Sequence, residues 1–232
     1  CNAQAKEHSN PYRVLFSNDF TNINTCVSPY HGRGQQWIPQ MLGEKWTPQM
    51  LQASVDETAG LGVDVHMLQP AHGWVPWWQS DVYPMKEHFE WWNSRYGDYP
   101  KKDGIHEYIL NGGDPFEVFI DRCRQHGIAP FISLRMNDGH HLERIDRPDY
   151  YMGAHAISKF YVQHPEYRLG GQSQGWDSRV QNWAIKEVRD HKFAFIEEIC
   201  RKYDIDGFEM DFMRHHTLFR VDQTTSSQRR NI

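Results

Sequence analysis

The stretch NWAIKEVRDHKFAFIEEICRKYDIDGFEMDFMRHH, residues 182–216, decides the fold. Its first part spaces apolar side chains as an amphipathic helix does, which predicts a helix from Asp177 or Ser178 to about Tyr203. Directly afterwards, residues 205–212 (IDGFEMDF) alternate apolar and acidic residues and predict a buried strand. A helix that leads at once into a strand is half of a βαβ unit, so the stretch favours an α/β fold.

The rest of the chain repeats this helix and strand order. Apolar runs bounded by turn residues predict strands at residues 13–19, 62–68 and 128–135, and helical spacing predicts helices at 47–60 and 114–127. Thr47-Pro48 and Asp114-Pro115 are strong helix starts, with an N-cap residue before a first-turn proline. A short helix near residues 154–160 is also compatible with the pattern. The alternation indicates right-handed parallel βαβ units.

Loop lengths distinguish the two common α/β architectures. The loops after the strands are long, whereas the connections from helix to strand are short, which is typical of a (β/α)8 TIM-barrel type of fold. A nucleotide-binding fold would carry a glycine-rich turn after its first strand, and residues 17–21 (SNDFT) are not one. A barrel needs eight strands and about 250 residues. We therefore expect residues 11–232 to form only the N-terminal half of a barrel, with about four βα units.

Composition excludes several classes of protein. Hydrophobic residues make up 39% and charged residues 24%, and the formal net charge is -5, so no nucleic-acid partner is indicated. No apolar run reaches the roughly 18–20 residues of a membrane span. The chain has 9 Trp and 14 His, and this aromatic content is a first indication of a ligand that stacks on rings. No cofactor motif is present, and no cofactor is expected.

The four cysteines are widely spaced and form no zinc pattern. The start CNAQAKEHSN resembles the mature end of a bacterial lipoprotein. Residues 1–10 would then be a tether, and a lipid on Cys1 would anchor the protein to a membrane of the bacterial cell envelope, facing the periplasm or the exterior. An arbitrary boundary at Cys1 is an equally good explanation. The oligomeric state cannot be inferred.

Glu209 and Asp211 are the candidate catalytic groups. Side chains on a strand alternate between its faces, so both carboxylates point toward the barrel interior. The opposite face carries Phe208, Met210 and Phe212. Neighbouring carboxylates repel, which separates their pKa values and suits acid and base chemistry. Asp211 ranks first because it lies nearer the C-terminal end of the strand. The alternative is a structural pair neutralised by Arg135.

Polar and aromatic residues after the predicted strands are candidates for substrate binding. They are Asp19, Gln69, His72, Trp74, Trp78, Arg135, Asn137, His140, His141 and Arg214. Arg135 and Asn137 could bind hydroxyl groups, and Arg214 could keep Asp211 ionised. A turn-stabilising role is an equally good explanation for Asp19.

The indole and imidazole rings among these candidates each have a competing explanation. Trp74 and Trp78 could form a stacking platform or could close the core of their own loop. His140 and His141 could bind a metal, but adjacent histidines point apart on most backbones. Loop hydrogen bonding or substrate contact is therefore favoured, and no metal is expected.

Residues 182–216 also resemble a block of the bacterial glycosyl-hydrolase-like family 10 and related TIM-barrel glycosidases. The residues that match its D-G-hydrophobic-x-hydrophobic-D-[FY]-hydrophobic-R pattern are Asp206, Gly207, Asp211, Phe212 and Arg214. Residues 133–141 (SLRMNDGHH) and 16–22 (FSNDFTN) resemble the family's third-strand and first-strand blocks. The resemblance implies a TIM barrel, a secreted bacterial protein and a carbohydrate substrate. A fainter similarity to the chitinase D-G-x-D-x-D-x-E motif fails at Met213, which replaces the catalytic glutamate.

The sequence thus predicts a glycoside hydrolase that cleaves O-glycosidic bonds of a polysaccharide or oligosaccharide. Asp211 would be the nucleophile or base and Glu209 an acid or supporting group, although the second carboxylate could come from a later strand. Residues 11–232 would be the N-terminal portion of this catalytic domain. Two alternatives stay open: a non-catalytic carbohydrate-binding lipoprotein, and a metal-dependent barrel hydrolase that uses His140, His141 or His215.

Overall fold

The computed structural model describes residues 12–25, 46–70, 72–97, 104–145, 156–170 and 178–230. The tether predicted at residues 1–10, with the lipid anchor on Cys1, lies outside these ranges. No helix in the described ranges is long and apolar enough to cross a membrane.

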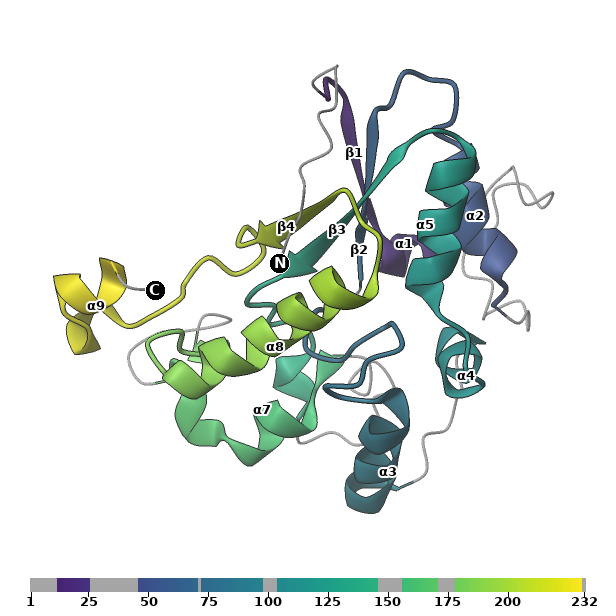
Figure 1. Cartoon of the computed structure of the whole chain (residues 1–232). Helices are drawn as coiled ribbons and strands as arrows, with labels where there is room; N and C mark the ends of the chain where they lie inside the picture. Colours follow the sequence, from purple (N-terminus) through teal and green to yellow (C-terminus); the bar gives the residue numbers. More distant parts are fainter. Residues whose placement is uncertain are drawn as a thin grey trace.

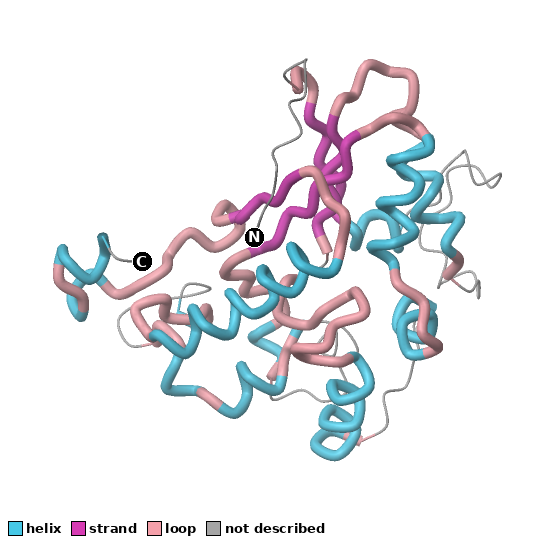
Figure 2. The backbone as a smooth tube through the Cα atoms, in the orientation of Figure 1, coloured by secondary structure: helices cyan, strands magenta, loops and turns pink. Residues whose placement is uncertain are grey.

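Four parallel strands form one sheet in the order β1-β2-β3-β4, shown in magenta in Figure 2. They are β1 (Leu15–Asp19), β2 (Val65–Gln69), β3 (Ala129–Arg135) and β4 (Gly207–Asp211). All four lie where the apolar runs predicted strands. The spatial order equals the chain order, and each crossover contains at least one helix. The described chain is therefore a mixed α/β fold around an open parallel sheet.

The helices vary in how clearly the sequence marks them. Their bounds are α1 Phe20–Thr25, α2 Pro48–Asp56, α3 Met85–Tyr96, α4 Gly104–Leu110, α5 Pro115–Gln125, α7 Lys159–Gln163, α8 Lys186–Lys202 and α9 Ser226–Arg230. Short 3-10 turns lie at η3 Leu142–Arg144, η4 Pro165–Tyr167 and η6 Val221–Gln223. Helix α5 starts as predicted, because the Asp114 side chain accepts a hydrogen bond of 3.0 Å from the Phe116 amide. The predicted helix at 47–60 is confirmed as α2.

Helix α8 begins eight residues later than the predicted start at Ser178, so that start was wrong. The backbone of residues 178–182 pairs instead with residues 167–170, through the Leu169 amide to the Val180 carbonyl (2.9 Å) and the Asn182 amide to the Tyr167 carbonyl (2.7 Å). These groups cannot also make helical hydrogen bonds. Val180 is buried although it lies in a loop, so the apolar spacing of the helix seemed to extend back to this residue.

One face of the sheet packs against helices, and the other carries the polar side chains. Leu68, Ile132 and Leu134 are fully buried in a core that includes residues of α2, α5 and α8. Figure 1 shows α5 and α8 against the sheet, whereas α9 lies apart from it. Phe208 packs against this core as predicted, but Met210 is 54% exposed. Since β4 is the last strand of the described sheet, no described neighbour covers Met210.

The aromatic loop after β2 folds into the protein interior. Trp78 is fully buried, with its ring stacked on that of Phe116 at 5.2 Å between centroids. Trp74 is 2% exposed, and its Nε1 donates a 3.0 Å hydrogen bond to the Asp138 carbonyl. The proposal that these two rings form a stacking platform was wrong, because both close the core between the loop and its neighbours.

A single carboxylate on α8 holds this loop. Glu198 accepts hydrogen bonds from Trp78 Nε1 (2.9 Å), Ser80 Oγ (2.8 Å) and the Asp81 and Val82 amides. A carboxylate satisfied by four donors makes strong hydrogen bonds. Glu198 therefore fixes the loop onto α8.

We expect Glu198→Ala to lower the free energy of unfolding by about 2–3 kcal/mol, because it leaves the buried Trp78 indole without an acceptor. Urea denaturation measures the change. Glu197→Ala is the matched control, since Glu197 pairs with the exposed Arg201 of the same helix, and it should change the value by no more than about 0.5 kcal/mol. Equal effects of the two substitutions would contradict this role.

Candidate functional site

The carboxyl ends of the four strands bring together four of the predicted site residues. The sheet register aligns Asp19 with Gln69 and Arg135 with Asp211. Gln69 Nε2 donates a 2.6 Å hydrogen bond to Asp211 Oδ2. This bond reaches from β2 to β4 across β3, so both side chains lie on the sheet face opposite the helices. The strand ends therefore assemble one polar surface, as the sequence predicted.

Arg135 is buried and bridges two carboxylates of this surface. Its Nη2 pairs with Asp19 Oδ2, and its Nη1 lies 3.0 Å from Asp138 Oδ2. The Asp19 carboxylate also accepts hydrogen bonds from the amide (2.8 Å) and hydroxyl of Thr21, so its turn-stabilising role at the start of α1 is confirmed. Arg135 thus neutralises Asp19 and Asp138 rather than the Glu209 and Asp211 pair.

The two candidate catalytic carboxylates have different surroundings. Asp211 is half-buried and accepts from Gln69 and, at 2.8 Å, from the Met213 amide. Glu209 is exposed and accepts from the Ser133 hydroxyl. Within the described residues Arg214 forms no ion pair with Asp211; it is exposed, so its predicted role as that partner was wrong. The Gln69 amide, and not Arg214, is the side-chain partner that binds the Asp211 carboxylate.

Asn137 is buried and bound to the backbone, which excludes the predicted contact with substrate. Its Nδ2 donates to the carbonyls of Gln181 (3.1 Å) and Thr217 (3.0 Å), and its Oδ1 accepts from the Gln181 amide (3.1 Å). The side chain has little capacity left for a ligand. Asn137 instead ties the segments before α8 and after β4 to the end of β3.

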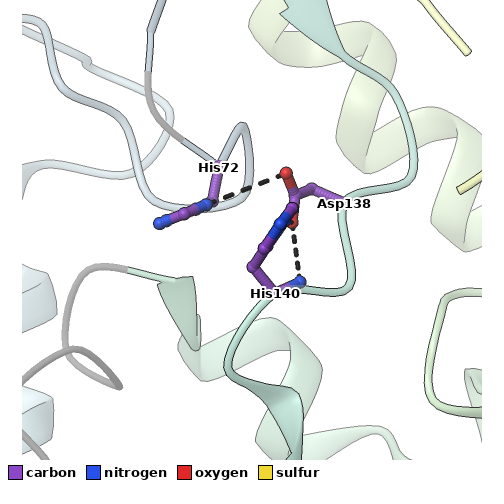
Figure 3. A group of neighbouring side chains, drawn as sticks. All are labelled: His72, Asp138 and His140. Carbon is purple, nitrogen blue, oxygen red and sulfur yellow. Dashed lines mark hydrogen bonds and ion pairs between the residues drawn. The ribbon is translucent and has the colours of Figure 1, made fainter. Parts of the chain in front are cut away.

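Three side chains from the loops after β2 and β3 form a second polar cluster. His72, Asp138 and His140 each place one potential ligand atom within 4.8 Å of the others. His140 Nδ1 lies 2.7 Å from Asp138 Oδ1, and His72 Nδ1 lies 3.7 Å from Asp138 Oδ2. Figure 3 shows both imidazoles directed at the one carboxylate. We call these three residues the His–Asp–His cluster.

Electrostatics in and around the cluster follow from burial and pairing. Burial would raise the pKa of Asp138, but the hydrogen bond with His140 and the charge interactions with both imidazoles outweigh it and hold that pKa well below its usual range. Burial lowers the pKa of His72 and lowers that of His141 to about 4. His141 also has a left-handed φ of 63°, which turns its ring to within 5.2 Å of the His72 ring. At neutral pH Asp138 is therefore a charged carboxylate.

Lys192 of α8 lies directly beneath the polar surface and was not predicted. It is fully buried, and its Nζ donates to the carbonyls of Gly73 and Arg135, the second at 3.0 Å. The same Nζ lies 3.9 Å from the centre of the Trp74 ring. Burial lowers its pKa to about 7. The sequence signal for this buried lysine was its position in the apolar stripe of the predicted helix.

Buried histidines make the fold sensitive to acid. Burial lowers the pKa of His66 to about 4, because its ring packs edge-on between Phe16 and Phe119. Between pH 6.5 and 4 the unfolded chain binds a proton that the folded chain excludes. The contribution of His66 to the free energy of unfolding is therefore fully present above pH 6.5. It is lost as the pH falls from 6.5 to 4, and the loss is about 3 kcal/mol.

We expect His66→Leu to remove part of this pH dependence. Urea midpoints at pH 7.5 and pH 4.5 should differ less in the variant than in the wild type, because leucine binds no proton in either state. An unchanged difference would show that His66 does not contribute to the acid sensitivity.

Comparisons with known proteins find remote similarities only. No protein-family model and no curated protein matches the chain. One similar solved structure is the galactosidase domain of the alpha-galactosidase-sucrose kinase AgaSK, with 18% identity over 88% of this chain and a TM-score of 0.44. Another is the GH36 alpha-galactosidase AgaB from Geobacillus stearothermophilus, with 14% identity over 93% of this chain and a TM-score of 0.45. This chain covers 21% and 23% of those two chains, and neither similarity identifies its family.

Proposed function

We propose that this chain is part of a glycoside hydrolase whose active site lies at the carboxyl ends of β1 to β4. The observation that carries the proposal is the position of Asp211. Its carboxylate lies at the end of β4, half-buried, on the open polar face of the sheet, with the Gln69 amide bound to one oxygen. Parallel α/β folds bind their ligands at this end of the strands.

Asp211 is the nucleophile or base in this proposal. Two hydrogen-bond donors, from Gln69 and Met213, orient its oxygens. Cleavage of a glycosidic bond also needs an acid to protonate the leaving oxygen. Glu209 shares the face and is the acid or a supporting group; a carboxylate of a later strand is the other candidate for the acid.

Sugar hydroxyl groups would bind to polar groups rather than to indole rings. Asp19 and Gln69 present charged and amide groups around Asp211, whereas Trp74 and Trp78 are buried, as is the Arg135 side chain that pairs with Asp19. This distribution disfavours the alternative of a non-catalytic protein that binds glycans on exposed tryptophans.

The sheet is, in this proposal, the first half of a (β/α)8 barrel with its polar face toward the barrel interior. Three features support it: parallel strands in chain order, helices on one face, and long connections at the carboxyl ends. Partly uncovered apolar side chains on the polar face, such as Leu15 at 50% exposure, fit a surface that further strands cover.

The test is hydrolysis of a panel of polysaccharides and oligosaccharides by the protein that carries this chain. Newly released reducing ends measure the reaction, and its dependence on Asp211 assigns the site. No product from any glycan of the panel would contradict the proposed activity.

A further inference from the structure

We propose that the His–Asp–His cluster binds one divalent transition-metal ion, with zinc as the best fit. The cluster lies in the loops after β2 and β3 and is separate from the Asp211 carboxylate on β4. Among the described histidines, cysteines and acidic residues, only these three bring three ligand atoms so close together. Two imidazoles and one carboxylate form a donor set that zinc commonly takes.

The distances in the cluster lie on either side of the spacing between ligand atoms in a zinc site. Ligands bound to zinc at about 2.0–2.2 Å and tetrahedral angles lie roughly 3.4 Å from one another. The Asp138 oxygens lie 2.7 Å from His140 Nδ1 and 3.7 Å from His72 Nδ1. Small side-chain rotations would therefore bring the atoms into coordination distance.

His72 supplies the second, independent observation. It is 5% exposed, and neither of its ring nitrogens has a hydrogen-bond partner among the described residues, although Nδ1 is directed at Asp138. A buried imidazole without a hydrogen bond is costly. Coordination of a metal by Nδ1 would satisfy it.

The surroundings hold Asp138 as ligating carboxylates are usually held. Arg135 donates to its Oδ2, and the Trp74 indole donates to its main-chain carbonyl. Gly139 allows the turn to approach Val180, because a Cβ at this position would lie 2.8 Å from the Val180 Cγ1. The side chains of Asp138 and His140, on either side of Gly139, point toward each other.

Two further imidazoles surround the cluster. The ring of His215 lies 5.5 Å from that of His140, and the ring of His141 lies 5.2 Å from that of His72. Either could complete the coordination after a change of rotamer, or a water molecule could take the fourth position.

The experiment is titration of the metal-free full chain with Zn²⁺ by calorimetry, with Co²⁺ absorption as a spectroscopic readout of coordination. The wild type should show one site that His140→Ala and Asp138→Asn each weaken by at least about 10- to 100-fold, the loss typical of disturbing a metal site. His164→Ala is the matched control, because His164 also pairs with a carboxylate, Glu166 at 3.0 Å, but lies outside the cluster; it should bind as the wild type does.

Circular dichroism of each metal-free variant shows whether it is folded, and His140→Ala removes the least buried of the three ligands. Equal zinc affinity in the wild type and in folded His140→Ala would overturn the proposal, and so would absence of zinc binding by the wild type. Hydrolytic activity is not a readout here, so failure of the proposed glycosidase function would not affect the result.

Discussion

Asp211→Asn should abolish glycoside hydrolysis while the protein stays folded. Asparagine has nearly the same shape and keeps one oxygen for the Gln69 amide, so we expect a stability loss of only about 1 kcal/mol. It cannot attack an anomeric carbon or accept a proton as a carboxylate does. The turnover number should therefore fall by about 1,000-fold or more, the scale seen when a directly acting group is removed.

Reducing-end release at saturating substrate measures this loss in the protein that carries the chain. Asp190→Asn provides the matched control, because Asp190 is an exposed partner of Lys186 on α8 and lies outside the site. The control should retain wild-type turnover. Turnover of Asp211→Asn within about tenfold of the wild type would exclude Asp211 as the nucleophile or base.

Arg135→Met should destabilise the fold more than any other single change considered. The guanidinium is 3% exposed and neutralises both Asp19 and Asp138. Methionine fills a similar volume but leaves the Asp138 carboxylate, whose side chain is 1% exposed, without its cation. Removal of one partner from a buried ion pair costs about 3–5 kcal/mol.

Urea denaturation at pH 7.5 measures this effect as well. Arg201→Met is the matched control, because Arg201 pairs with Glu197 on the surface of α8 at a side-chain exposure of 72%. An exposed pair contributes about 0–1 kcal/mol, so the control should lose no more than that. A loss below about 1 kcal/mol in Arg135→Met would show that water or other donors satisfy Asp138.

The strands were predictable because each combines an apolar run with clear boundaries. Helix α5 was predictable for a similar reason, since Asp114 and Pro115 mark its start. Helix α3 was missed: it follows Pro84 without a side-chain cap, and its rings resembled those of a loop. Only the burial of Met85, His88 and Trp92 on one side shows the helical period. Residues of this kind fold by tertiary packing, which a single sequence does not display.

The site was predictable where strand geometry alone positions side chains. Asp19, Gln69, Arg135 and Asp211 meet because parallel strands end at one edge. Prediction failed for Asn137, Trp74 and Trp78, whose partners lie on loops and helices far away in the sequence. The His–Asp–His cluster was missed for the same reason, since His72 and Asp138 are 66 positions apart in the chain and no local pattern links them.

The buried Lys192 fixes the start of the loop after β2 to helix α8. One ammonium group bonds to the main chain of both Gly73 and Arg135, while Glu198 holds residues 78–82 from the same helix. Both ends of the segment from Gly73 to Val82 are therefore tied to α8, and we expect this segment to keep its position when a ligand binds.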